Sequence, residues 1–154
     1  MASRRDQIRM SDAELAAFLD EQKVMQCATL GPAGRPHLVP LWYVHDGGEL
    51  RGWTYAASQK ARNLERDPRA TLGIDDGVEY HELRGVMFEC DVDVEQVAEN
   101  VAGYGLELFE RYGGGELSDE VRAMVEKQAP KRVGLRFTPT RTVTWDHSKL
   151  GGTY

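Results

Sequence analysis

Apolar positions along the chain fall into short runs separated by glycine, proline and aspartate. In the central stretch, one run covers His37–Val44 and a second covers Leu50–Tyr55, with a turn signal beginning at Asp46 between them. Apolar runs at this separation are typical of a β-hairpin. Ser58 then stands at a helix cap position, and the residues after it predict a short helix over Gln59–Arg66. The stretch therefore predicts strand, turn, strand and helix in that order.

The same patterning predicts about six strands in all, with a few short helices. The further strands are expected at Val24–Leu30, at Arg69–Asp75, within Leu83–Val94, and over Lys131–Phe137 and Thr140–Trp145, which form a pair or one strand bent around Pro139. Helices are expected after the caps Ser11 and Ser118 and along an apolar stripe at three-four spacing, Val94, Val97, Val101, Tyr104 and Leu108. This order indicates an α+β fold that is mainly β, or a small barrel.

The composition narrows the class of protein. Its 154 residues predict a single domain, which we place at residues 11–150, between a flexible basic arm at 1–10 and a short C-terminal tail at 151–154. A net charge of -6 argues against a general nucleic-acid binder, and no apolar run approaches the length of a membrane span. The two cysteines, Cys27 and Cys90, lie in apolar runs without a CxxC motif, which predicts reduced thiols in a cytoplasmic protein.

The predicted helix after Ser58 carries its charges in an unfavourable order. Lys60 and Arg62 lie in its first turn, and Glu65 and Asp67 lie at its end. A helix dipole favours the reverse order by ~0.3–1 kcal/mol per charge. An anion bound at the helix start corrects this, because free N–H groups and both cations converge on it. The alternative interpretation is a solvated helix whose charges are screened.

The two strands before this helix carry residues that suit a flat ligand. Pro40 cannot donate to a strand ladder, so we place it at an edge or a bulge, and Gly52 allows a flat group to approach the backbone. Aromatic residues stand on both strands: Trp42, Tyr43, Trp53 and Tyr55. Aromatic strand residues form a core more often than a cofactor platform, and both interpretations stay open.

Other chemistries lack their motifs. The four histidines form neither HExxH nor a Cys/His cluster with zinc spacing, so no metal site is predicted. The sequence has no G-x-S-x-G elbow, no Walker loop and no GxGxxG that opens a βαβ unit. The acidic pairs are most simply charges of a loop and of a helix start. What remains is a site for a planar, anionic ligand.

Two segments, ATLGPAGRPHLVPLWYV and WTYAASQKARNLERDPRATL, carry a family resemblance. Their most specific part is the pair Ser58 and Lys60, followed by Asn63-Leu64 and Asp67-Pro68. With these motifs the chain resembles the split β-barrel flavin-binding family related to pyridoxamine 5'-phosphate oxidase. The segments LRGVMFEC, ERYGG, KRVGLRF and RTVTWDHSKLG are similar to an actinobacterial branch of that family, which uses the deazaflavin coenzyme F420 instead of FMN.

The resemblance implies a six-stranded antiparallel split β-barrel of the FMN-binding type with flanking short helices. It implies cofactor contacts from the strand under the ring and ribityl chain, Leu38, Val39, Pro40, Leu41 and Trp42, and from the pair Trp53 and Thr54. It implies a phosphate pocket at Ser58 and Lys60, with Asn63 in the same motif and Arg35 and Arg62 on a basic path for the acidic tail. The chain departs from the oxidases at Gln59, where they carry arginine, and in lacking their basic strand residues and C-terminal signature.

The expected activity is that of a reductase. The reduced coenzyme would deliver hydride to an electron-poor C=C, C=O or related bond of a small-molecule acceptor, which the sequence does not identify. A homodimer is expected, and the proton donor is Tyr55, Tyr104, His147 or water. Two alternatives stay open: an FMN- or haem-handling protein with the same barrel, and a non-catalytic module that stores or shields the coenzyme.

Overall fold

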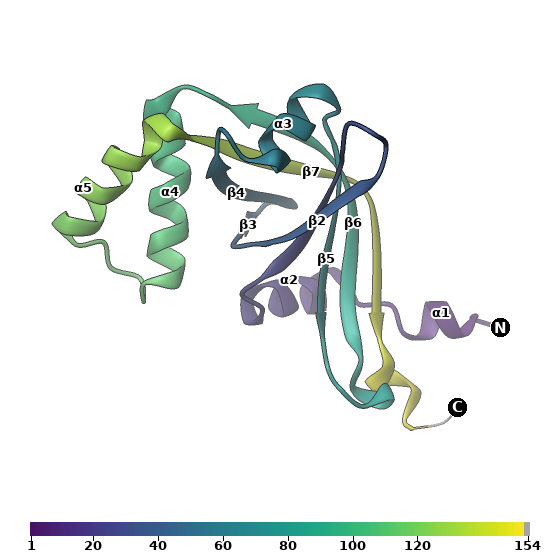
Figure 1. The fold of residues 1–154 in the computed structure, drawn as a ribbon. Helices are drawn as coiled ribbons and strands as arrows, with labels where there is room; N and C mark the ends of the chain where they lie inside the picture. The colour runs from purple at the N-terminus through teal and green to yellow at the C-terminus, as the bar shows by residue number, and fades with distance from the viewer. Residues whose placement is uncertain (153–154) are drawn as a thin grey trace.

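The computed structural model describes residues 1–152 and contains one antiparallel sheet with short helices around it (Figure 1). The sheet has seven strands in the order β2-β1-β5-β6-β7-β4-β3. The strands are β1 (Met25–Leu30), β2 (Pro36–Leu41), β3 (Val44–Asp46), β4 (Glu49–Tyr55), β5 (Arg69–Asp76), β6 (Arg84–Glu95) and β7 (Arg132–Asp146). The helices are α1 (Arg4–Gln7), α2 (Asp12–Glu21), α3 (Gln59–Arg66), α4 (Ala98–Tyr112) and α5 (Asp119–Gln128), with 3-10 turns η1 (Tyr80–Glu82), η2 (Ala129–Lys131) and η3 (His147–Leu150).

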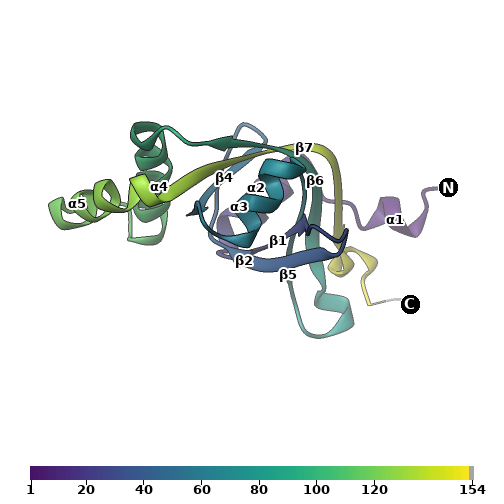
Figure 2. The ribbon, with the colours of Figure 1, turned by 45° about the horizontal axis from the view of Figure 1, so that its top comes forward.

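The sheet curls into a half-barrel because its two edge strands are neighbours in the chain. Strand β2 pairs only with β1, and β3 pairs only with β4. In the chain, β2 and β3 are separated by just two residues, Trp42 and Tyr43. Figure 2 looks onto the end of the curled sheet, with α3 lying across it. The predicted count of six strands is therefore wrong: the apolar run over His37–Val44 breaks where the chain passes from one edge to the other. The prediction that Pro40 lies on an edge is confirmed.

Serine caps define the helix starts as the sequence predicts. The Ser11 hydroxyl accepts the N–H of Glu14 and the Ser118 hydroxyl accepts the N–H of Val121, so α2 and α5 begin directly after these residues. Helix α3 has the predicted bounds. Helix α4 instead begins at Ala98, because Val94 still belongs to β6. The predicted stripe is therefore helical only from Val101 onward.

The long strand β7 settles the choice between a strand pair and one bent strand. It is a single strand over Arg132–Asp146, and its register with β6 shifts between Glu89 and Cys90, opposite Pro139. Such a bulge places one extra residue on one strand and bends it. Before the bend, β7 lies between β4 and the end of β6. After it, β7 runs along the first half of β6 alone (Figure 1).

Two groups of buried side chains lie on either side of this sheet. The larger fills the half-barrel and includes Phe18, Tyr43, Leu72 and Phe137. It also buries both cysteines, and burial raises the pKa of the Cys27 and Cys90 thiols to about 12. The smaller group lies under the α4–α5 hairpin and centres on Trp53, Val101, Leu108 and Val125.

The N-terminal ten residues contact the last part of the chain. Met10 is buried, its N–H donates to the Thr144 hydroxyl at 3.0 Å, and the Ile8 carbonyl accepts the Asp146 N–H at 2.7 Å. The predicted tail at 151–154 lies partly outside the described residues. None of the helices within residues 1–152 is long and apolar enough to cross a membrane.

Candidate functional site

The turn from β4 into α3 brings three predicted site residues together. Lys60 Nζ donates to the Thr54 hydroxyl at 2.9 Å, and that hydroxyl lies 3.4 Å from the Ser58 hydroxyl. Ser58 also caps α3, since its side chain accepts the N–H of Ala61 at 3.2 Å. Thr54 lies near the end of a strand and Lys60 near the start of a helix, so the short turn fixes their separation. The result is a small group of donors and hydroxyls at a helix N-terminus.

Lys60 is a buried cation without an acidic partner. It is 8% exposed, and among residues 1–152 no carboxylate forms an ion pair with it. Burial lowers the pKa of its amine, and the positive charge of Arg132 adds to this. A buried charge normally has a counter-charge, because desolvation is costly. An anion bound beside Thr54 and Ser58 supplies that counter-charge.

Arg132 connects this group to a cavity. Its guanidinium carbon lies 4.5 Å from the centre of the Trp53 ring and 3.9 Å from the centre of the Tyr55 ring. The one hydrogen bond of its side chain within the described residues is a long one of 3.5 Å to Gln128. Sequence reasoning missed Arg132, because only the pairing of β7 with β4 places it opposite Tyr55.

The cavity has a volume of about 340 Å³ and lies between the barrel and the α4–α5 hairpin. Pro40, Leu41, Trp42 and Trp53 form its barrel side, and all four are among the residues that the sequence predicts for a ring site. The rest of the lining consists of residues that the sequence did not suggest for the site: Leu108 and Phe109 of α4, Met124 and Gln128 of α5, and Arg132 at the start of β7. Aromatic and apolar walls with a cation at one end suit a planar ligand that carries a negative group.

The two tryptophans of the cavity do not form a flat platform. Trp53 is only 9% exposed and lies against α4, so close that a methyl group on Gly105 would stand 2.5 Å from its ring. Trp42 is 46% exposed and stacks on Tyr112, with ring centres 4.2 Å apart and planes 7° from parallel. Phe109 meets both indoles edge-on. Trp42 is therefore the half-exposed wall of the cavity and Trp53 the buried one.

The sequence predicts that Gly52 leaves room for a flat ligand, but in the structure that space is taken by the protein's own backbone. A side chain there would meet the carbonyl oxygen of Trp42 at 3.1 Å. The glycine thus allows the link between β2 and β3 to pass close to β4. Its small size is explained by packing inside the protein.

The remaining predicted site residues lie outside this arrangement. Leu38 is 63% exposed, Arg35 and Arg62 are exposed, and Val39 lies on the edge strand β2. Asn63 is fully buried, and its amide donates to the Thr29 hydroxyl at 3.0 Å and accepts from Gln59 at 2.7 Å. These hydrogen bonds of Asn63 connect α3 to β1 and stabilise their packing.

The three predicted proton donors lie far apart along the fold. Tyr55 lies beside Arg132 and is half-exposed next to the cavity. Tyr104 packs on the backbone of Gly134, and His147 contacts Tyr80 near η3. Tyr55 is therefore the one of the three that the structure brings to the site.

A second cavity of similar volume, about 350 Å³, lies over β1, β5 and β6. It contains none of the predicted cofactor residues. The cavity beside Trp53 is the candidate site because Arg132, which interacts electrostatically with Lys60, lines it.

Comparison with solved structures shows close similarity to one protein and a shared fold with others. A conserved hypothetical protein from Mycobacterium tuberculosis is 42% identical, with a TM-score of 0.89 over 99% of this chain and 95% of that one. An F420 reductase is 24% identical, with a TM-score of 0.65 over 82% and 93% of the two chains. The heme storage protein of Vibrio cholerae is 19% identical, with a TM-score of 0.70 over 89% and 97%.

Family comparison covers nearly the whole domain. No curated protein sequence matches this chain. Residues 11–146 match the family described as pyridoxamine 5'-phosphate oxidase. This range includes every residue of the cavity and of the group around Lys60. Because the match spans most of the chain, the protein belongs to the pyridoxamine 5'-phosphate oxidase family.

Proposed function

We propose that the protein binds the deazaflavin coenzyme F420 and acts as a reductase of the deazaflavin-dependent branch of its family. The observation that carries the proposal is the buried amine of Lys60, whose only hydrogen-bond partner among the described residues is the Thr54 hydroxyl. A phosphate held there by Lys60, Thr54 and Ser58 gains charge-assisted hydrogen bonds in a desolvated place. The solved structure of an F420 reductase with the same fold supports the choice of coenzyme.

The residues present fit each part of such a coenzyme. The phosphate matches the α3 N-terminus, and the ring matches the cavity walls Trp42 and Trp53, reached past Arg132. Arg35 and Arg62 are exposed, which suits contact with a flexible acidic tail. When bound, the reduced coenzyme supplies a hydride. FMN is the alternative ligand of this site, because it also joins a planar ring to a phosphate.

The chain's own residues would position the acceptor and limit the access of water. The walls formed by Leu108, Phe109 and Met124 are apolar, so they shield one side of a small molecule in the cavity from water. An electron-poor C=C or C=O bond would gain a hydride on one atom and a proton, drawn from water, on the other. Arg132 lines the cavity and can donate to the atom that becomes negative, and the Tyr55 ring lies against its guanidinium.

Titration of the purified protein with oxidised and reduced F420, FMN and haem tests the proposal. We expect the reduced deazaflavin to bind most tightly and to be oxidised when a panel of conjugated carbonyl acceptors is added. Tighter binding of FMN or haem would replace the proposal with the corresponding alternative. Coenzyme binding without turnover over a broad panel would favour a storage protein.

The proposal includes a twofold homodimer in the cytoplasm. The outer edge strand β2 exposes Leu38, and Trp42 beside it is half-exposed, which suits burial against a second copy. Sedimentation of the titrated samples reports the assembly directly. A monomer at all micromolar concentrations would remove the dimer from the proposal.

A further inference from the structure

We infer that Arg111 and Tyr112, at the end of α4, are positioning residues that set the place of Trp42 in the cavity. The inference rests on the proposed function to this extent: Trp42 is the wall expected to contact the coenzyme ring. Neither Arg111 nor Tyr112 lines the cavity. They act through the two-residue link between β2 and β3.

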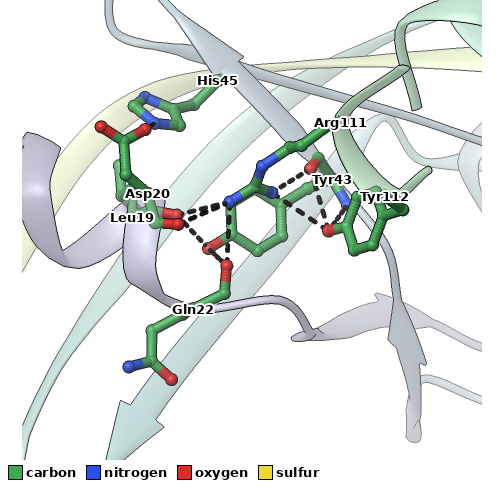
Figure 3. A network of polar contacts seen from close by, with 7 residues as sticks. All are labelled: Leu19, Asp20, Gln22, Tyr43, His45, Arg111 and Tyr112. Atoms are coloured by element: carbon green, nitrogen blue, oxygen red, sulfur yellow. Dashed lines mark hydrogen bonds and ion pairs between the residues drawn. The ribbon is translucent and has the colours of Figure 1, made fainter. Parts of the chain in front are cut away.

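The guanidinium of Arg111 binds backbone oxygens on two elements at once (Figure 3). One terminal nitrogen donates to the Leu19 carbonyl at 2.8 Å and the Gln22 carbonyl at 2.9 Å, both at the end of α2. The other donates to the Tyr43 carbonyl and to the Tyr112 hydroxyl. The last carbonyls of a helix lack partners within the helix and favour a cation, so Arg111 completes the end of α2.

Tyr43 lies at the centre of this network. Its ring is fully buried, and its hydroxyl lies 2.7 Å from the Leu19 carbonyl oxygen, to which it donates. The guanidinium of Arg111 lies over the same ring, 4.5 Å from its centre. Burial raises the pKa of the Tyr43 phenol, so this donor keeps its proton near neutral pH.

Tyr112 holds the other backbone group of Tyr43 and touches Trp42 itself. Its hydroxyl accepts the Tyr43 N–H at 3.0 Å and donates to the Lys23 carbonyl at 2.6 Å. Its ring is the one that stacks on Trp42, and Figure 3 shows the contacts of its hydroxyl with Tyr43 and Arg111. The N–H and the C=O of Tyr43 are thus both bonded to side chains of α4 rather than to a neighbouring strand.

This arrangement explains how the indole of Trp42 can be half-exposed and still fixed. The backbone beside it is clamped by Arg111, and its free face is covered by the Tyr112 ring. The cavity wall therefore depends on two residues from α4, 69 and 70 positions further along the chain than Trp42. Loss of either should move Trp42 while the barrel stays folded.

Near-ultraviolet circular dichroism tests the inference without any cofactor. The signal of Trp42 is the difference between a protein with Trp42 and the same protein with Trp42→Phe. We expect this difference to be large in the wild type and lost in an Arg111→Met background. Arg84→Met is the matched control, because Arg84 also ties α2 to the barrel, through Glu21 and Asp76, but lies away from Trp42. The Trp42 signal should persist there.

Affinity for F420 is the second measurement. Arg111→Met should weaken binding by about tenfold, the scale of a lost aromatic wall, while Arg84→Met should leave it unchanged. If Arg111→Met does not fold, the pair Tyr112→Phe and Tyr112→Leu decides: the first keeps the stacked ring and loses the hydroxyl bonded to Tyr43, so the Trp42 signal should be reduced, and the second loses the ring as well, so the signal should be lost.

An unchanged Trp42 signal in Arg111→Met or in Tyr112→Leu overturns the inference. A wild-type protein that binds no F420 refutes the proposed function, yet the dichroism result still decides whether these residues position Trp42. The two failures are therefore distinguishable.

Discussion

Helices α2 and α3 begin with the same kind of cap and differ in the charges of their first turns. Each has a serine cap whose hydroxyl accepts the N–H three residues on. In α2 the first turn carries Asp12 and Glu14, whereas the first turn of α3 has no acidic residue and a buried Lys60. Helices α1 and α5 are like α2, with acidic residues in the first turn.

The difference shows which helix start is complete without a ligand. Glu14 accepts the Ser11 N–H and pairs with Lys149 at 2.8 Å, so the positive end of α2 is balanced inside the chain. At α3 the positive end of the dipole, Lys60 and Arg132 lie together without a negative group among the described residues. Breaks in a local rule of this kind are expected at functional sites, where a ligand supplies what the chain lacks.

The largest expected effect comes from replacing Lys60, the buried cation that distinguishes the start of α3 from that of α2. In Lys60→Gln the cost of burying an unpaired charge disappears, so the apo protein should be equally stable or slightly more stable. Binding of F420 should weaken by roughly 1.5–3 kcal/mol, the scale of a charge-assisted hydrogen bond. Thermal melts of both apo proteins and isothermal titration measure the two quantities.

Arg62→Gln is the matched control, since Arg62 is an exposed cation on the same helix. Its effect on affinity should be smaller and should grow with the length of the acidic tail of the coenzyme. Added salt should weaken binding by the wild type more than binding by Lys60→Gln. Unchanged affinity in Lys60→Gln would remove the phosphate from this helix.

Substitutions at two glycines of α4 test the ring end of the site without changing the group around Lys60. In Gly105→Ala the new methyl group would stand 2.5 Å from the Trp53 ring, whereas at Gly103 nothing lies within 4 Å. We expect Gly105→Ala to lower the free energy of unfolding by ~1–3 kcal/mol through overpacking. Gly103→Ala should raise it by ~0.5–1 kcal/mol, since alanine suits a helix better.

Urea unfolding measures both changes, and titration of the variants adds the functional contrast. Gly105→Ala should weaken coenzyme binding and leave its salt dependence intact, because the group around Lys60 is unchanged. Equal stabilities of the two variants would mean that Trp53 moves freely, and that the wall it forms is not fixed.

The parts of the fold that depend on neighbouring residues could be predicted from the sequence. The caps Ser11, Ser58 and Ser118 and the bounds of α3 follow from local hydrogen bonds and breakers. The break at Trp42 could not be predicted, because it depends on the pairing of β2 and β3 with strands at opposite ends of the sheet and on Tyr112. Val94 fits a helical spacing by coincidence, since the strand alternation of β6 continues through it.

The candidate site divides in the same way. Thr54, Ser58 and Lys60 lie within seven residues of one another, and the inverted charge order of α3 marks them in the sequence. The wall from α4 and α5 and the cation Arg132 come from residues between 108 and 132, and the sequence pattern of the two helices is that of ordinary amphipathic helices. The sequence suggests Trp53 as a ring contact, but its burial depends on Gly105, which only the packing of α4 brings near.

The smallest expected effect is a difference in how the two helix starts respond to pH. Hydrogen bonds from Lys149 and Ser11 lower the pKa of Glu14 to about 2, so its contribution is present near neutral pH and is lost as the pH falls towards 2. For Lys60 the lowered pKa has the opposite meaning near neutral pH, because burial disfavours the charged amine and the cation therefore costs stability there. In the alkaline range between that lowered pKa and the pKa of a lysine in the unfolded chain, the unfolded state holds more protons, so stability rises with pH.

Urea unfolding of the apo protein measures both effects. The free energy of unfolding should rise in the alkaline range, and Lys60→Gln should abolish that rise. It should fall in acid, and Glu14→Gln should reduce that fall. An alkaline profile identical in wild type and Lys60→Gln would mean that Lys60 is solvated, and that the start of α3 is as complete as that of α2.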